Sequence, residues 1–448
     1  MAPHCHVSRK LLARMLAGEL PEGAATRRNL RRVAAECPDC AEALAVFAAG
    51  AREQAARRPE LAPRVFELAR IGWLDPPAVL PALYRRARRD LRRLRRLPVE
   101  ERADAVGRAW RSWRSPAHLE LLLAEAREAL RADPQEGLAW LDAAREAAQA
   151  LLAAGYSLAL VQAWQLRIAA HRANALRVGG DLPTADRAFA GLAGDPRRRH
   201  LLEPAHHAEL ASLEGSLRLD QRRFEEAEEL LAAAIDLYRE AEDREGLAKA
   251  LIQLGIASLR RGEAAGGIPI LREAAALLPP DSAPRLYLYA QHNLALCHCQ
   301  TGDFGAAAAL VEANRPLYQR FDDLEVKLLW SWLEGRVARG LGEGAIAEQL
   351  LVETRDGYLG RGQGFPVALV TLDLAELYLE DGWTTEVKCL AAATAAVFVA
   401  QDVHAEAERV LRLFCDAAAA ERLTLELIAC FWTYLERAYC DPGLRFEP

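Results

Sequence analysis

Cysteine and histidine residues near the start of the chain form a pattern that suits a metal ion. Cys37 and Cys40 make a C-x2-C knuckle, and His4, Cys5 and His6 lie 31 or more residues upstream. The two-residue spacing lets both thiolates face one ion from a single turn, and zinc in structural sites takes four thiolate or imidazole ligands. The pattern therefore indicates a candidate zinc site.

The segment that carries these residues resembles the zinc-binding anti-sigma-factor domain of bacteria. The likeness rests on the early Cys or His, a short helix that closes on Gly-Glu-Leu at residues 18–20, and the C-x2-C pair. It implies a small helical domain over residues 1–50, a role with a sigma factor as partner, and four zinc ligands. These ligands are Cys5, His6, Cys37 and Cys40, with His4 as the alternative to His6.

One position departs from that family, whose pattern places a His four residues before the first Cys. This chain has Val33 there. The alternative is a metal-free finger held by apolar packing. The residues that would supply this packing are Leu11, Leu12, Leu16, Leu30 and Val33.

An arginine-rich helix is predicted over residues 80–97, within a linker region at 51–114. Apolar residues recur there at three- and four-residue spacing, and residues 85–96 hold eight Arg against one Asp, a local charge of +7. Guanidinium groups bind phosphate and carboxylate in a bidentate way, so the helix is a candidate partner-binding surface. The candidate contacts are Arg85, Arg88, Arg89, Arg92, Arg95 and Arg96.

Two interpretations of this helix stay open. It contacts a nucleic-acid backbone or an acidic partner, or it is a solvated helix packed on the acidic remainder of the same chain. Residues 1–114 carry a net charge of +11 and residues 115–448 a net charge of −17, which favours the second interpretation. Aromatic residues for base stacking are scarce nearby, so sequence-specific RNA recognition is not indicated.

Elsewhere the sequence offers little chemistry. Cys297 and Cys299 flank His298, but positions i and i+2 of a helix point about 200° apart, so these thiols are expected to be buried rather than to share an ion. The chain has no G-x-S-x-G, no H-E-x-x-H and no phosphate-loop Lys, and we expect no enzyme activity. Trp330 and Trp332 with Arg336 and Arg339 are candidates for lining a groove, and interface packing is the alternative.

The elements that position these residues follow from a repeat. Small residues recur at intervals of 40, and a Gly turn follows seven residues later in four of the five copies. A compact residue follows twelve positions after each small one, which predicts two antiparallel helices in close approach. The small residues are Gly215, Gly255, Ala295, Gly335 and Ala375; the turn glycines are Gly262, Gly302, Gly342 and Gly382; the second-helix residues are Ala227, Gly267, Ala307, Ala347 and Val387.

These segments resemble the tetratricopeptide repeat family over residues 115–448, with a period of 40 instead of the family's 34. The resemblance implies an all-α, right-handed helical-repeat superhelix with a groove for a protein or peptide partner. A less regular pair over 119–153, an earlier copy at Ala173, Gly180 and Ala185, and a C-terminal cap over 405–439 complete the array.

The composition of the chain excludes several classes of protein. The chain has 448 residues, of which 52% are hydrophobic and 27% charged, which excludes a disordered protein, and its alanine excess excludes an all-β one. No apolar run is long enough for a membrane helix, and no secretory signal is recognised. Nine irregularly spaced Cys predict reduced thiols in the cytoplasm. We therefore expect a non-enzymatic regulatory adaptor, with a nucleic-acid-associated protein as the alternative.

Overall fold

The computed structural model describes residues 81–130, 133–194, 201–281, 283–361, 363–400, 411 and 414–440. Helices form throughout this part of the chain, and it contains no strand. The predicted domain over 1–50, with Cys5, His6, Cys37 and Cys40, lies outside the described residues. Packing divides the chain into two compact units, Met1–Glu203 and Pro204–Pro448, which we call unit 1 and unit 2.

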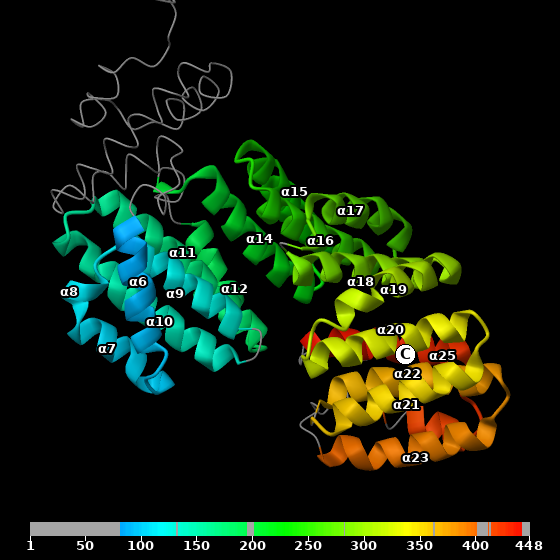
Figure 1. The fold of residues 1–448 in the computed structure, drawn as a ribbon. Coiled ribbons are helices and arrows are strands. Elements are labelled where there is room, and N and C mark those ends of the chain that lie inside the picture. The colour runs from blue at the N-terminus through cyan, green and yellow to red at the C-terminus, as the bar shows by residue number, and fades with distance from the viewer. Residues whose placement is uncertain are drawn as a thin grey trace, which may run out of the picture. The chain divides into compact units, whose positions relative to one another are not determined.

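Unit 1 is built around α10, which packs against α7, α8, α9 and α11 (Figure 1). Its described helices are α6 (Pro81–Leu94), η2 (Val99–Glu101), α7 (Arg102–Arg108), α8 (Trp110–Trp113), α9 (Pro116–Ala129), α10 (Pro134–Ala153), α11 (Leu158–Val178) and α12 (Leu182–Ala193). The predicted hinge between α9 and α10 is present, because the Asp133 side chain accepts a hydrogen bond from the backbone N–H of Gln135 at 2.8 Å.

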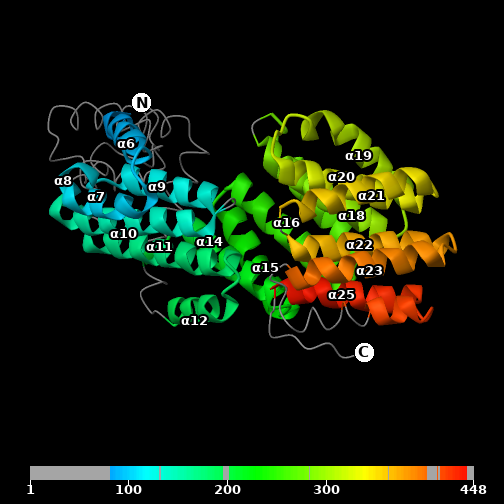
Figure 2. The ribbon, with the colours of Figure 1, turned by 90° about the horizontal axis from the view of Figure 1, so that it is seen from below.

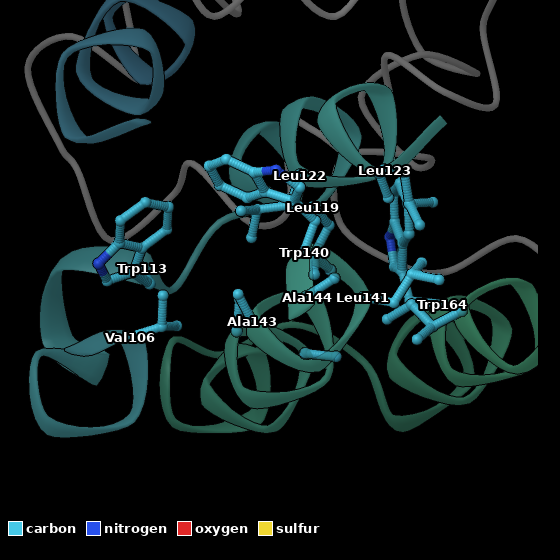
Figure 3. Close-up of a cluster of buried hydrophobic side chains, with 14 of the residues drawn as sticks. Val106, Trp113, Leu119, Leu122, Leu123, Trp140, Leu141, Ala143, Ala144 and Trp164 are labelled. Carbon is cyan, nitrogen blue, oxygen red and sulfur yellow. The ribbon is translucent and has the colours of Figure 1, made fainter. Parts of the chain in front are cut away.

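The core of unit 1 combines alanines on α10 with large side chains from α10 itself and from the surrounding helices (Figure 3). Ala143 and Ala144 are completely buried, so α10 is approached closely on several sides. Trp113, Trp140 and Trp164 fill the space around it. The Arg102 guanidinium lies 4.2 Å from the ring centre of Trp140 and forms an ion pair with Glu136 at 2.8 Å.

Unit 2 is a stack of helical hairpins followed by a terminal helix (Figures 1 and 2). The hairpins pair α14 (Pro204–Asp220) with α15 (Phe224–Glu240), α16 (Arg244–Arg261) with α17 (Ala264–Leu277), α18 (Pro284–Gln300) with α19 (Phe304–Tyr318), α20 (Leu324–Gly340) with α21 (Gly344–Leu359), and α22 (Gly364–Glu380) with α23 (Thr384–Ala400). Each second helix also packs on the first helix of the next hairpin.

The predicted small residues lie where the two helices of a hairpin meet. All ten are buried, five on first helices and five on second helices. A Cβ atom added at Gly255 would lie 2.5 Å from the Leu271 side chain, and one added at Gly215 would lie 3.0 Å from Leu231. The small residues therefore allow the close approach that the sequence predicts.

The turn glycines adopt the left-handed conformation that the repeat requires. Their φ angles are +88° at Gly262, +78° at Gly302, +77° at Gly342 and +72° at Gly382. The hairpin that lacks a turn glycine places Arg222 in the same conformation, with φ at 57°. Its guanidinium donates a hydrogen bond to the backbone oxygen of Arg260 and lies over an aromatic ring, and both contacts offset the cost of that conformation.

The stack ends in a helical cap. Residues 414–419 are helical, and α25 (Leu425–Cys440) packs against α22 (Figure 2). Phe414 and Phe431 meet edge to face, with ring centres 6.2 Å apart, and both are buried. The cap covers the apolar face of the last hairpin, as terminal units of a repeat array must.

Candidate functional site

The first helices of the hairpins in unit 2 share a row of polar side chains that connects one repeat to the next. Ser212 on α14 donates a hydrogen bond to Gln253 on α16 at 2.6 Å, and Arg260 forms an ion pair with Asp220 at 3.0 Å. The paired residues are separated by about one repeat in sequence, because successive first helices lie next to each other. The row is therefore a consequence of repeat stacking.

The row is densest on α18, α20 and α22, where aromatic and charged side chains gather. We call this group the aromatic–ionic cluster. Its members are His292, Arg315, Tyr318, Trp330, Trp332, Glu334, Arg336, Arg339, Asp373, Glu376 and Trp432. Four of these, Trp330, Trp332, Arg336 and Arg339, are the predicted groove residues, and all four lie on α20.

Trp330 forms the aromatic end of the cluster. Its ring stacks on Tyr318 with ring centres 5.2 Å apart and an angle of 11° between the planes. The Arg315 guanidinium lies 5.2 Å from the centre of the same indole and forms an ion pair with Glu334 at 3.0 Å. These two contacts from α19 hold the indole in one orientation while part of the side chain remains accessible to solvent.

Asp373 is the buried acid of the cluster, with 2% of its side chain exposed. It accepts a hydrogen bond from Nε1 of Trp332 at 2.5 Å, and its other oxygen lies 4.0 Å from Nε of Arg336. Arg336 also lies 5.3 Å from the ring centre of Trp432 on α25. The Asp373 carboxylate thus holds the Trp332 indole and the Arg336 guanidinium of the preceding repeat in place, and Arg336 in turn contacts the cap.

A second ion pair lies beside the first, between Arg339 and Glu376. Arg339 also lies 3.9 Å from Glu380. Burial raises the pKa of Glu376 and of Glu334 above the usual value, although their arginine partners act in the opposite direction. The cluster therefore holds carboxylates that are shielded from water and depend on specific guanidinium partners.

Two indole N–H groups of the cluster have no hydrogen-bond partner among the described residues. They are Nε1 of Trp330 and Nε1 of Trp432, and both atoms are buried. A buried donor without an acceptor costs about 1–3 kcal/mol, so most proteins satisfy such groups. Each can donate a hydrogen bond to a backbone or side-chain oxygen that a bound partner brings within reach.

His292 gives the cluster a pH dependence that can be measured. Its Nδ1 lies 2.9 Å from the Tyr318 hydroxyl, and burial together with the charge of Arg336 lowers its pKa to about 4 from an ordinary 6.5. Between pH 4 and pH 6.5 the His292 imidazole is protonated in the unfolded chain and neutral in the folded chain. We therefore expect His292 by itself to lower the free energy of unfolding by about 2.5 kcal/mol as the pH falls from 6.5 to 4.

The measurement is the urea unfolding midpoint as a function of pH, for the wild type and for His292→Gln. The amide of Gln retains a group that can bond Tyr318 but does not titrate, so the variant should lose less stability over this range. Identical slopes in the two proteins would contradict the assignment.

The arginine-rich helix occupies its predicted place as α6. Its apolar stripe, Tyr84, Ala87, Leu91 and Leu94, is buried against neighbouring helices of unit 1. All six candidate arginines are exposed, but the helix ends at Leu94, three residues earlier than predicted: Arg85, Arg88, Arg89 and Arg92 lie on α6, and Arg95 and Arg96 in the turn that follows it. These arginines belong to unit 1, and the aromatic–ionic cluster belongs to unit 2.

Cys297 and Cys299 lie on α18 and are buried, as predicted. Burial raises the pKa of Cys297 to about 12 and that of Cys299 to about 11, so neither is a thiolate near neutral pH. Within the described stretches, no group of three or more His, Cys, Asp or Glu side chains could hold a metal ion. The same stretches contain no helix that is both long enough and apolar enough to span a membrane.

Several members of the cluster were not predicted. Asp373 lies 41 positions after Trp332, one residue past the equivalent position of the next repeat, so the period places it near the tryptophan without singling it out. Tyr318 belongs to a series of buried residues near the ends of second helices, Tyr238, Leu278, Tyr318 and Tyr358, again at intervals of 40. Trp432 carries no such signal, because the cap departs from the repeat.

No protein-family model matches the chain, and no curated protein matches it. Solved structures do match. A Rap protein complexed with Competence and Sporulation Factor aligns with a TM-score of 0.54 and 11% identity, over 72% of this chain and 87% of the Rap chain. The apo form of RapI aligns with a TM-score of 0.51 and 11% identity, over 71% and 86%. At this identity the likeness concerns the fold alone, and it confirms the predicted all-α, tetratricopeptide-like helical-repeat fold.

Proposed function

We propose that this protein is a non-enzymatic adaptor that binds a protein or peptide through the first helices of unit 2. The observation that carries the proposal is the aromatic–ionic cluster with its two unsatisfied indole donors, Trp330 Nε1 and Trp432 Nε1. Aromatic and arginine side chains held rigidly in a partly exposed cluster are typical of residues that dominate binding energy. A Rap protein of this fold forms a complex with Competence and Sporulation Factor, which supports a binding role.

Other features of the cluster favour binding over catalysis. The carboxylates of Asp373 and Glu376 are engaged by arginines, and Asp373 also holds an indole N–H. His292 has a lowered pKa but contacts the Tyr318 hydroxyl. These groups orient one another, and what remains accessible is part of the Trp330, Trp332 and Arg336 side chains.

The test is co-purification of the tagged full-length chain from its native cell, with the partner identified by mass spectrometry and then bound again as a purified component. Trp330→Ala is expected to weaken that reconstituted binding by at least about tenfold, because it removes a rigid aromatic contact of the kind worth more than 1 kcal/mol. The matched control is Trp383→Ala, since Trp383 is also partly exposed in unit 2 but stacks on Tyr378, outside the cluster. Equal binding by the wild type and Trp330→Ala would contradict the proposal.

The finer assignment of a bacterial transcription regulator with a sigma factor as partner is part of this proposal. It is supported by the resemblance of residues 1–50 to the anti-sigma-factor domain and by the Cys37/Cys40 knuckle. A sigma factor should then be among the co-purified proteins. Deletion of residues 1–50 should abolish its recovery, while the partner of the repeats should be retained.

Zinc binding by the same segment gives a separate prediction. If Cys5, His6, Cys37 and Cys40 form one site, the purified chain should contain one zinc ion per molecule. Cys37→Ser should lower that content to near zero, whereas Cys389→Ser, an exposed thiol of unit 2, should leave it unchanged. Elemental analysis after exhaustive dialysis provides the measurement, and metal-free wild-type protein would exclude the site.

A further inference from the structure

The exposed side of α6 carries more positive charge than the described carboxylates neutralise. The single acid of the helix, Asp90, is shared by Arg86 at 3.6 Å, Arg93 at 3.9 Å and His118 at 3.4 Å. Glu125 is engaged by Arg95. Five arginines remain that pair with no described residue, and we call them the arginine face: Arg85, Arg88, Arg89, Arg92 and Arg96.

These five residues form one continuous surface because of their spacing. Arg85, Arg88, Arg89 and Arg92 lie within one side of α6, and Arg96 follows in the turn after Leu94; the opposite side of the helix is fixed by Tyr84, Leu91 and Leu94 in the core of unit 1. The Tyr84 hydroxyl also donates a hydrogen bond to Glu120 on α9 at 2.6 Å. The backbone that presents the guanidinium groups is therefore anchored along its length.

The density of charge distinguishes between two kinds of partner. From residue 85 to residue 96 a helix rises about 16 Å, and over that length one strand of a duplex carries about five phosphates. An acidic helix matches that number only where five carboxylates share one face within about three turns, whereas every duplex carries such a row of phosphates whatever its sequence. Five guanidinium groups match the phosphate backbone in number.

We propose that the arginine face binds the phosphate backbone of a nucleic-acid duplex, independently of the protein partner of unit 2. Recognition is by charge and not by base sequence. Of the aromatic residues nearest in sequence, Tyr84 and Trp113 are buried, and the partly exposed ring of Trp110 is covered by the Arg111 guanidinium, 4.9 Å from the ring centre. The two compact units then serve different partners, unit 1 a polyanion and unit 2 a protein or peptide.

The test is binding of the full-length chain to a fluorescently labelled 20-base-pair DNA duplex of arbitrary sequence, by anisotropy at several salt concentrations. Release of counterions from about five phosphates predicts a slope of about −4.5 for log K against log salt, or roughly a 500-fold loss of affinity between 50 and 200 mM. Replacing the five arginines of the face by Gln should remove most of this slope and weaken binding at 100 mM salt at least about 100-fold.

The matched control replaces five exposed arginines of unit 2 by Gln, which gives the same change in net charge: Arg239, Arg244, Arg261, Arg285 and Arg320. This control should bind DNA like the wild type, and all three proteins should give the same circular dichroism spectrum. Absence of DNA binding, binding independent of salt, or equal loss in the two variants would overturn the proposal. Competition by polyglutamate as effective as that by the duplex, at equal charge, would assign the face to an acidic protein instead.

Discussion

Asp373→Ala is expected to lower the free energy of unfolding of unit 2 by about 3 kcal/mol. The carboxylate is 2% exposed, holds the Trp332 indole and lies 4.0 Å from Arg336. Its removal leaves a buried N–H donor without an acceptor and a guanidinium without its nearest carboxylate. Hydrogen exchange of the α20 and α22 amides is the measurement, because it reports on unit 2 separately from unit 1.

Asp373→Asn is the matched variant. The amide oxygen still accepts the hydrogen bond from Trp332, but the negative charge beside Arg336 is lost. We expect about half the destabilisation of the alanine variant. If alanine and asparagine cost the same, the hydrogen bond to the indole contributes nothing, and if neither reduces protection, Asp373 does not hold the cluster together.

Two glycine-to-alanine substitutions should change stability in opposite directions. Gly255 lies in α16, and its added Cβ atom would lie 2.5 Å from Leu271, whose side chain is completely buried and cannot move aside. We expect Gly255→Ala to destabilise the protein by about 2 kcal/mol, as overpacking of a core does. Gly266 lies in α17 with nothing within 4 Å of its added Cβ atom.

Gly266→Ala should therefore stabilise the protein by up to about 1 kcal/mol, since alanine favours the helix and no neighbour opposes it. The two variants make the same chemical change at positions eleven residues apart, so each serves as the control for the other. Urea unfolding of both provides the comparison. A stabilising Gly255→Ala would mean that the hairpins are not packed as closely as the repeat requires.

The repeat fold was predictable because close packing restricts residue types at fixed intervals. Gly255 and Ala295 are small for the same reason one repeat apart, and Gly262 and Gly302 both require a positive φ. The Arg222 turn was harder to predict, since an arginine in the left-handed conformation depends on its contacts with the Arg260 backbone and Phe224. A restriction on residue type that recurs in every repeat leaves a periodic pattern that a single sequence shows. A contact between residues far apart in the sequence leaves no such pattern.

The candidate site was predictable in part for the same reason. Trp330, Trp332, Arg336 and Arg339 stood out because they lie close together on one predicted helix. Their partners lie on neighbouring repeats and on the cap, so Asp373 and Trp432 could be joined to them only by the stacking of hairpins.

The sequence by itself determined the helices, their pairing into hairpins and the opposite charges of the two ends of the chain, because spacing and composition encode these directly. It also determined that α6 has an apolar stripe and a basic side. The tertiary structure decided which charges are neutralised: Arg95 by Glu125, Arg339 by Glu376, and the arginine face by no described residue. Neutralisation depends on a few ångströms of separation between side chains far apart in sequence, and only the packed fold sets those distances.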